Sequence, residues 1–215
     1  MLDETNDPRV QKEINSRFKR YDVLNRLVSL YGYNSYLEIG VFDGENFSRI
    51  ECPHKTGVDS GAEGLLIDSV TWRVTSDEFF ASISEEEKFD LIFIDGDHSF
   101  LQVLRDIENS LRHLSNNGTI CLHDSSPPTP ASASDPRRTI VWCGEVWRAV
   151  AHIRSEWKNV RVQTVDCDFG VTIITRGDVS QRLPRVSFYD YFARNRKEIL
   201  NLMPAESWFA ENCNA

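Results

Sequence analysis

Two glycines and one acid mark a turn that could hold a ligand. They stand in the run Glu38-Ile39-Gly40-Val41-Phe42-Asp43-Gly44, directly after a short apolar stretch. Glycines at a strand-to-helix turn let the backbone pass close to a bound molecule. A dinucleotide site would use Gly-x-Gly-x-x-Gly and place a pyrophosphate on the helix N-terminus. Here the central glycine is missing, and the Glu38 carboxylate would repel a pyrophosphate and attract a cation.

A second acid stands at the distance expected of a ribose-binding residue. Asp59 ends the next β-rich stretch, about 20 residues after Glu38, which is the spacing at which a carboxylate meets the ribose diol in Rossmann-like folds. S-adenosylmethionine (SAM) has a ribose, an ammonium group and a sulfonium, but no phosphate. The charge of Glu38 therefore favours SAM over NAD. Two plainer interpretations stay open: an accidental glycine turn, and Asp59 as a turn or helix cap.

A cluster of acids and histidines follows two further apolar stretches. Its members come after residues 89–94 and 119–122, and they are Asp95, Asp97, His98, His123 and Asp124. Because the carboxyl ends of neighbouring parallel strands meet at one edge of a sheet, we expect these five to lie together. One interpretation is a divalent metal site. A second is acid–base chemistry, with His98 beside Asp97 as general base, or Asp97 itself if a metal lowers the pKa of a hydroxyl. A third is that His98 and Ser99 cap the following helix.

The elements around these residues alternate between strand and helix. Strands are predicted at residues 36–39, 56–59, 71–74, 89–94 and 119–122, and helices at 43–50, 77–83, 99–114 and 145–157. Residues 160–165 and 171–175 are β-rich and close enough to form a hairpin. The pattern predicts an α/β fold: a Rossmann-like, doubly wound, mostly parallel sheet with a C-terminal antiparallel hairpin strand.

The domain limits follow from the same pattern. Residues 1–34 are expected to form one lead-in helix that starts at Asp7-Pro8 and ends at Gly32. Residues 35–180 form the cofactor domain, and 181–215 a helical tail. Residues 125–138 are rich in proline and serine and predict a mobile loop or lid. Just beyond it, an acceptor pocket could be lined by Trp142, Glu145, Trp147 and Arg148, although a helix that packs Trp147 on the core explains them equally well.

The middle of the chain resembles the class I SAM-dependent methyltransferases. The resemblance runs over residues 36–124 and is closest to small-molecule O-methyltransferases that have an Asp-Gly-Asp-His-Ser segment, here Asp95-Gly96-Asp97-His98-Ser99. It implies that Glu38, Gly40 and Gly44 hold the methionine part and Asp59 the ribose. It also places Ser76 and Asp77 near the adenine, and Asp95 beside the cofactor.

The resemblance also bears on the metal. Metal-dependent members bind a divalent ion through acids at the positions of Asp95 and Asp124, and His123 stands where an acid is often found. A histidine ligand favours Mn or a similar ion over Mg. The expected ligands are Asp95, His123 and Asp124, with metal-free catalysis by Asp97 or His98 as the alternative.

Bulk properties agree with a small-molecule enzyme. The chain of 215 residues has a net charge of −9, which argues against nucleic acid as a partner. Its five cysteines have no metal-knuckle spacing, and no signal peptide or membrane span is predicted, so we expect reduced thiols and a cytoplasmic protein. The expected partner is a small-molecule acceptor, with a homo-oligomer left open.

The predicted reaction is methyl transfer from SAM to a hydroxyl of a sugar or secondary metabolite. Two alternatives belong to other classes. One is a metal-dependent glycosyltransferase that uses Asp95-Gly96-Asp97 as an Asp-x-Asp motif, and the other is a SAM-binding protein without catalytic activity.

Overall fold

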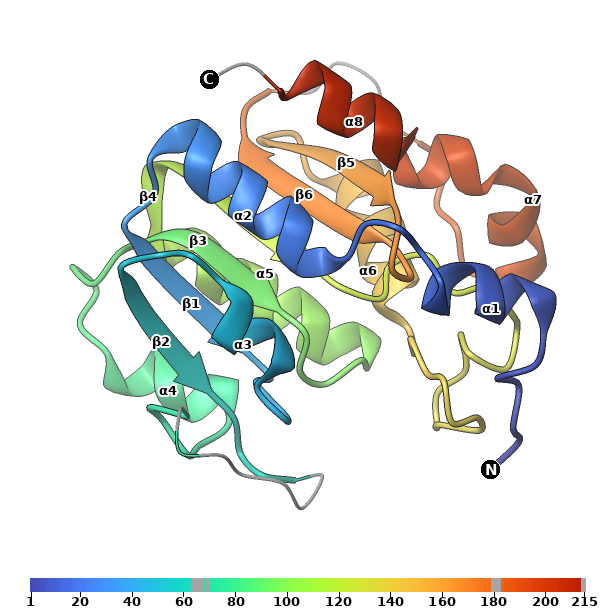
Figure 1. Ribbon diagram of the computed structural model, residues 1–215, viewed down its shortest axis with the longest axis horizontal. Helices are drawn as coiled ribbons and strands as arrows, with labels where there is room; N and C mark the ends of the chain where they lie inside the picture. Colours follow the sequence, from blue (N-terminus) through green and yellow to red (C-terminus); the bar gives the residue numbers. More distant parts are fainter. Residues whose placement is uncertain (63–67, 69, 179–182, 214–215) are drawn as a thin grey trace.

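One mixed sheet organises the chain. The computed structural model describes residues 1–62, 68, 70–178 and 183–213. Within them, seven strands form a sheet in the order β2-β1-β3-β4-β6-β5-β7 (Figure 1). The strands are β1 (Ser35–Ile39), β2 (His54–Val58), β3 (Phe89–Ile94), β4 (Leu114–Leu122), β5 (Val160–Asp166), β6 (Val171–Arg176) and β7 (Leu202–Pro204).

The predicted fold class is confirmed. Strands β1 to β4 pair in parallel, whereas β6 runs antiparallel to both β4 and β5 and completes the predicted hairpin. The central strand β3 is almost wholly apolar because both of its faces are covered. Ile92 and Ile94 face one layer of helices, while Leu91 and Phe93 face the other.

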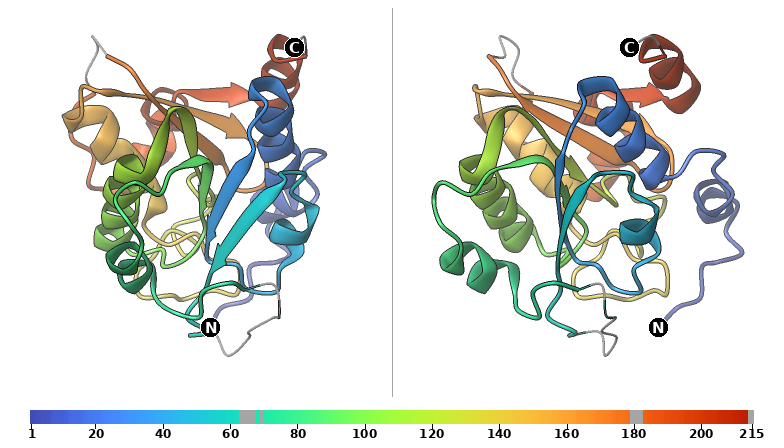
Figure 2. Two further views of the ribbon diagram at one scale, coloured as in Figure 1. Left: turned by 90° about the vertical axis from the view of Figure 1, so that its left-hand side faces the viewer. Right: turned by 60° about the vertical axis from the view of Figure 1, so that its left-hand side comes forward.

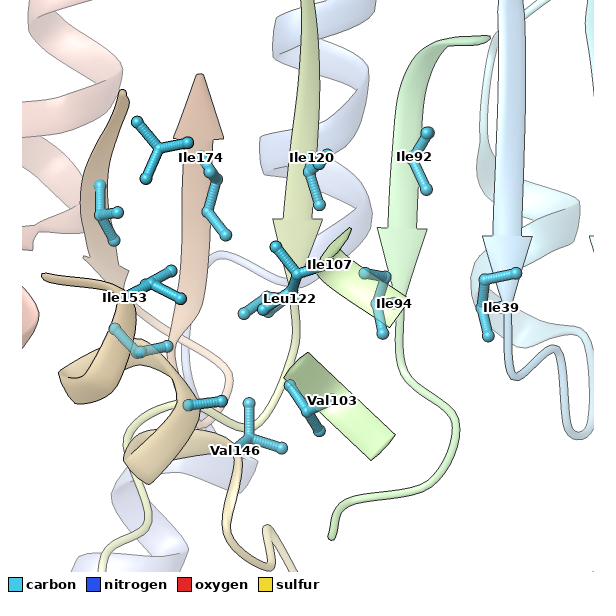
Figure 3. Packing of buried hydrophobic residues seen from close by; sticks show 14 of the residues in the cluster. Ile39, Ile92, Ile94, Val103, Ile107, Ile120, Leu122, Val146, Ile153 and Ile174 are labelled. Carbon is cyan, nitrogen blue, oxygen red and sulfur yellow. The ribbon is translucent and has the colours of Figure 1, made fainter. Parts of the chain in front are cut away.

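Helices cover both faces of the sheet (Figure 2). They are α1 (Pro8–Ile14), α2 (Arg20–Tyr31), α3 (Glu45–Arg49), α4 (Ser76–Ser82), α5 (Phe100–His113), α6 (Val146–Glu156), α7 (Tyr189–Leu200) and α8 (Ala205–Glu211). Helices α4 to α7 pack on one face, where Val103, Ile107 and Ile153 meet the strand isoleucines (Figure 3). Helices α2, α3 and α8 pack on the other face.

The lead-in segment is two helices rather than the predicted one. Asp7 caps the first helix with Pro8 at its first position, and Gly32 ends the second in the left-handed conformation, both as expected. The chain leaves the helical path between them, where Ser16 Oγ donates to the Phe18 carbonyl oxygen over 2.9 Å. Short polar side chains favour such local bonds over the helical ladder. The break lets α2 start at Arg20, beside the carboxyl ends of the strands.

The predicted strand at residues 71–74 is not formed. A single parallel bridge joins Trp72 to Val58, and the chain then turns into the Thr75 cap of α4. The indole of Trp72 packs edge-on against Phe79, with ring centroids 5.3 Å apart. Trp72 thus packs against α4 and does not contribute to a strand ladder.

The loop after β4 is better anchored than its composition predicts. Ser125, Ser126 and Thr129 are buried, and Thr129 Oγ1 donates to the Glu4 carboxylate over 2.6 Å. This burial and this hydrogen bond argue against mobility of its first half. Residues 135–138 are exposed, so mobility stays a prediction for that part.

The C-terminal tail contains a strand that the sequence did not predict. Strand β7 pairs in parallel with β5 and extends the sheet, and α8 then returns over the α2 face. The boundary expected between residues 180 and 181 lies outside the described residues.

Candidate active site

Gly40 lets the ends of β1 and β3 approach each other closely. Its φ is +86°, and a Cβ built there would lie 2.2 Å from the Asp95 carbonyl oxygen. Four residues on, Gly44 has a φ of +75° and forms the N-cap of α3. Both glycines therefore meet a backbone requirement of this turn, and their part in holding a cofactor stays a prediction.

Glu38 lies buried below this turn. It is 1% exposed, and its Oε2 accepts hydrogen bonds from the Tyr36 hydroxyl and from Asn46 Nδ2, the latter at 2.9 Å. Burial raises the pKa of Glu38 to about 8, although the two hydrogen bonds oppose the shift. Since both bonds use Oε2, the carboxylate keeps Oε1 for a cationic ligand.

One cavity joins the predicted cofactor residues to the acid and histidine cluster. It has a volume of about 820 Å³, within the range of small-molecule sites. Of the predicted cofactor residues, Gly44 shapes the turn without lining the cavity, and the residues that line it are Glu38, Gly40, Asp59, Ser76, Asp77 and Asp95. The five members of the predicted cluster line it too.

Asp59 holds the glycine turn as well as lining the cavity. Its Oδ2 accepts the Phe42 backbone N–H over 2.8 Å, and its Oδ1 accepts that of Gly61 over 2.7 Å. Phe42 has a φ of +48°, a conformation that side chains rarely adopt and that this bond helps to hold. A carboxylate has about four acceptor positions, so these bonds leave room for a ligand.

His123 is bonded on both ring nitrogens. Nδ1 lies 3.2 Å from Asp95 Oδ1 and 3.4 Å from Asp124 Oδ2, and Nε2 donates to the Asp168 carbonyl oxygen over 2.7 Å. Burial disfavours the charged ring, but Asp124 and Asp95 outweigh it and raise the pKa of His123 well above its usual value. The two acids thus favour the charged form of the ring.

His98 faces the same two acids from the start of α5. Nε2 lies 3.4 Å from Asp95 Oδ1 and Nδ1 lies 3.7 Å from Asp124 Oδ2. Nδ1 is buried and makes no hydrogen bond within the described residues. Burial lowers the pKa of His98, and the hydrogen bond to Asp95 together with the Asp124 charge more than reverses this, so the net shift is upward. The ring also stacks on Trp142, with centroids 5.0 Å apart.

The structure brings together one group of side chains that could hold a metal. Ligand atoms of Asp95, His98 and Asp124 lie within 4.8 Å of one another. This set adds His98 to the two predicted acids, and the predicted ligand His123, whose Nδ1 faces the same acids, stays a prediction. Asp124 has a φ of +57°, and such strain is common where a side chain must be aimed at a site.

Asp97 occupies a more exposed position than a buried general base would. Its Oδ1 accepts the Ser99 backbone N–H over 2.7 Å at the start of α5, whereas the Ser99 side chain makes no capping bond. Asp97 therefore does the capping that we predicted for its neighbours. It does not belong to the set of ligand atoms around Asp95, which removes support for an Asp-x-Asp metal motif.

Of the four predicted acceptor residues, Trp142 lines the cavity. Trp147 is 2% exposed and packs on Phe192, with ring centroids 4.6 Å apart. Glu145 and Arg148 pair with each other. The plainer interpretation, a helix that packs on the core, is thus confirmed for Trp147.

Two residues of the site were missed by sequence reasoning. Arg20 Nη1 lies 3.0 Å from Asp168 Oδ2, and the Arg20 backbone N–H donates to the same oxygen over 3.1 Å. Asp168 lies in the β5–β6 turn, far from Arg20 in sequence. One feature of the sequence could have pointed to Asp168. The segment Asp166-Cys167-Asp168-Phe169-Gly170 has two acids, which is more than a hairpin turn requires.

The comparisons identify the central part of the chain. Residues 37–125, from β1 to just beyond β4, match the family described as a methyltransferase domain. This segment, about two fifths of the chain, is therefore similar to methyltransferase domains. The predicted resemblance to methyltransferases is thereby confirmed, and no curated protein matches the chain.

Solved structures support the assignment of the fold. An O-methyltransferase from Bacillus cereus in complex with SAH is 16% identical with a TM-score of 0.53, and the match covers 82% of this chain and 92% of that one. A SAH-bound methyltransferase from Podospora anserina is 16% identical with a TM-score of 0.55, over 81% and 84%. The O-methyltransferase TomG from Streptomyces achromogenes, in complex with SAM, is 14% identical with a TM-score of 0.51, over 82% and 91%.

Proposed function

We propose that this methyltransferase transfers the methyl group of SAM to a hydroxyl oxygen of a small molecule, such as a sugar or a secondary metabolite. The observation that carries the proposal is that one cavity is lined by Glu38, Gly40 and Asp59 on the cofactor side and by Asp95, His98 and Asp124 on the reactive side. The similar solved O-methyltransferases with SAM or SAH agree with it.

The residues present fit SAM. Glu38 Oε1 would accept from the α-ammonium, and Asp59 would accept from the ribose hydroxyls. Gly40 lets the β1 and β3 ends, which border the cavity, come close together, because a Cβ there would overlap the β3 end. Ser76 and Asp77 line the same cavity and would border the adenine.

The chemistry needs orientation and the removal of one proton. Bound SAM supplies an electrophilic methyl group: its S–CH₃ bond breaks as the acceptor O–CH₃ bond forms, and SAH leaves. The protein contributes mainly by holding the two reactants in line. His98 Nδ1 is the best-placed acceptor for the hydroxyl proton, because it is buried and makes no hydrogen bond within the described part of the chain. Its raised pKa means that the neutral ring, which can accept a proton, forms at higher pH than in an ordinary histidine.

A divalent ion fits the reactive side. Asp95, His98 and Asp124 would hold it with two oxygens and one nitrogen, a donor set that suits Mn or a similar ion better than Mg. Bound there, the ion would lower the pKa of an acceptor hydroxyl. The unbonded Nδ1 of His98 favours this set, and with an ion bound there His98 would be a ligand in place of the proton acceptor, so the two roles are alternatives.

Other properties are consistent with a small-molecule enzyme. Among the described residues, no helix is long and apolar enough to cross a membrane, and the five cysteines are free thiols. A cytoplasmic location and the lack of a nucleic-acid partner are proposals that rest on these thiols and on the net charge of −9. A homo-oligomer is proposed as well.

The test is product formation from a panel of hydroxyl compounds. Sugars, phenols and hydroxy acids are incubated with SAM and protein, with and without Mn, and mass spectrometry follows SAH and the methylated acceptor. We expect O-methylated product from at least one class. Folded protein that binds SAH but converts no acceptor would favour the SAM-binding protein without activity. Binding of nucleotide sugars in place of SAH would favour the glycosyltransferase.

A further inference from the structure

Arg20 is held in a fixed orientation at the edge of the cavity. It is the first residue of α2, and its side chain lines the cavity together with Glu38. Asp168 Oδ2 accepts both from Arg20 Nη1, at 3.0 Å, and from the Arg20 backbone, at 3.1 Å. Lys19 Nζ adds a contact of 3.2 Å to Asp168 Oδ1. The guanidinium is thus anchored by one nitrogen and by its own main chain.

The other edge of this guanidinium has no hydrogen bond within the described residues. Arg20 Nε is buried and without a partner. The nearest carboxylate oxygen, Asp95 Oδ2, is 3.9 Å away, which is too far for a hydrogen bond. The Nε and Nη2 groups of an arginine point in parallel and bind a carboxylate with two hydrogen bonds. A buried donor without a partner is costly, so a ligand group at this edge would remove that cost.

The acidic residues that line the cavity make the Nε edge of Arg20 selective for a ligand with a carboxylate. Eight acids line it: Glu38, Asp43, Asp59, Asp77, Asp95, Asp97, Asp124 and Asp135. A carboxylate on a ligand needs a cation in such surroundings, and among the described lining residues the arginines are Arg20 and Arg137. Arg137 lies with Trp142, its guanidinium 5.6 Å from the ring centroid. Arg20 is close enough to Glu38 to lower the pKa of that carboxyl.

We infer that Arg20 binds the α-carboxylate of the methionine part of SAM. This rests on the proposed function. The α-ammonium and α-carboxylate of SAM are attached to the same carbon, so a ligand whose ammonium meets Glu38 must place its carboxylate nearby. Glu38 and Arg20 then recognise the two charges of the amino-acid end with side chains of opposite sign. Asp168 is a positioning residue, because it orients Arg20 without reaching the ligand.

The backbone around Asp168 supports a functional reason for this arrangement. Asp168 and Phe169 have φ values of +48° and +64°, and both are rare for residues other than glycine. Strain of this kind persists where the surroundings impose it and is concentrated at functional sites. Here it buries a carboxylate against Arg20 in the turn between β5 and β6.

The test compares three ligands and three proteins by calorimetry. The ligands are SAH, its analogue without the α-carboxylate, and 5′-methylthioadenosine, which lacks the whole amino-acid part. The proteins are wild type, Arg20→Gln, and Arg26→Gln as a control from the same helix that does not line the cavity. We expect wild type to bind SAH about 10- to 100-fold more tightly than the decarboxylated analogue, the range of a charged hydrogen-bond pair. Arg20→Gln should reduce SAH affinity by that factor and change the other two affinities less than about threefold.

Several results would overturn the inference. If Arg20→Gln weakened SAH and the decarboxylated analogue by the same factor, Arg20 would support the site without reading the carboxylate. Equal affinity of the wild-type protein for SAH and for the decarboxylated analogue would also refute the inference. This comparison needs no variant, so it stays valid even if Arg20→Gln does not fold. In both cases SAH binding by wild type would leave the proposed function standing. A wild-type protein that binds none of the three ligands would overturn both.

Discussion

His123 Nε2 donates to the carbonyl oxygen of Asp168 over 2.7 Å, and this bond holds the ring so that Nδ1 faces Asp95 and Asp124. His98 presents its two ring nitrogens to the same two acids, at 3.4 and 3.7 Å. The resemblance implies His123 as a metal ligand, whereas the ligand atoms that lie within 4.8 Å of one another are those of Asp95, His98 and Asp124. We therefore expect substitutions of the two histidines to have different effects on metal binding.

The first prediction concerns the metal. EDTA should reduce turnover at least tenfold, and Mn should restore it. His98→Ala should lose Mn binding, measured by calorimetry or electron paramagnetic resonance, while it still binds SAH. His123→Ala should instead lower the free energy of unfolding by roughly 3–5 kcal/mol, because it leaves buried carboxylates without their counter-charge. Full activity in EDTA, together with full activity of His98→Ala and Asp124→Ala, would show that turnover does not need a metal at this site.

The second prediction concerns Glu38, whose pKa of about 8 lies above its ordinary value of 4.5. The folded protein therefore binds this proton more tightly, and the free energy of unfolding should fall as pH rises from about 4.5 to 8. Glu38→Gln removes this loss and should be more stable than wild type at pH 8, by a few kcal/mol at most, with little difference at pH 4.5. Urea denaturation at the two pH values measures it.

Glu38→Gln should at the same time weaken SAH, because it removes the partner of the ammonium. Asn46→Ala offers a matched comparison, since it removes one hydrogen bond to Glu38 Oε2 and keeps the charge. A Glu38→Gln protein that is less stable than wild type at pH 8 would argue against the raised pKa.

The third prediction concerns Gly40. Gly40→Ala places a Cβ about 2.2 Å from the Asp95 carbonyl oxygen, and it should lower the free energy of unfolding by several kcal/mol and abolish SAH binding. Gly32→Ala is the control: Gly32 also has a positive φ, +65°, but nothing lies within 4 Å of its Cβ position. It should cost about 1–2 kcal/mol, the strain of the left-handed conformation alone. Equal losses in the two variants would mean that the β1 and β3 ends can move apart.

The fourth prediction concerns the loop after β4. Trypsin should cut first after Arg137 or Arg138, which are exposed, and later elsewhere in the loop, because residues 125–129 are buried. Mass spectrometry of early fragments identifies the bond. Slower cutting when SAH and acceptor are present would support a lid, and first cleavage at another site would contradict the prediction.

The sequence predicts those parts of the molecule that depend on local pattern. The apolar run of β3 and the turn at Gly40 are visible because burial on two faces and a close backbone approach restrict residue type. The contact between Arg20 and Asp168 cannot be predicted from local pattern. The two residues are 148 positions apart, and Arg20 stands at the start of α2 only because the helical path breaks before it. The choice between His98 and His123 depends on side-chain direction at two strand ends. Spacing alone does not determine that direction.

The most direct test of the account is a calorimetric titration of the wild-type protein with SAH. We predict one site per chain with micromolar affinity, weakened at least tenfold by Glu38→Gln and by Asp59→Ala. Glu45→Ala is the control, because Glu45 is an acid beside the glycine turn that does not line the cavity. Thermal melting in the presence of SAH should show the matching rise in Tm. A folded wild-type protein that gives no binding heat and no rise in Tm with either SAH or SAM would contradict the account at its centre.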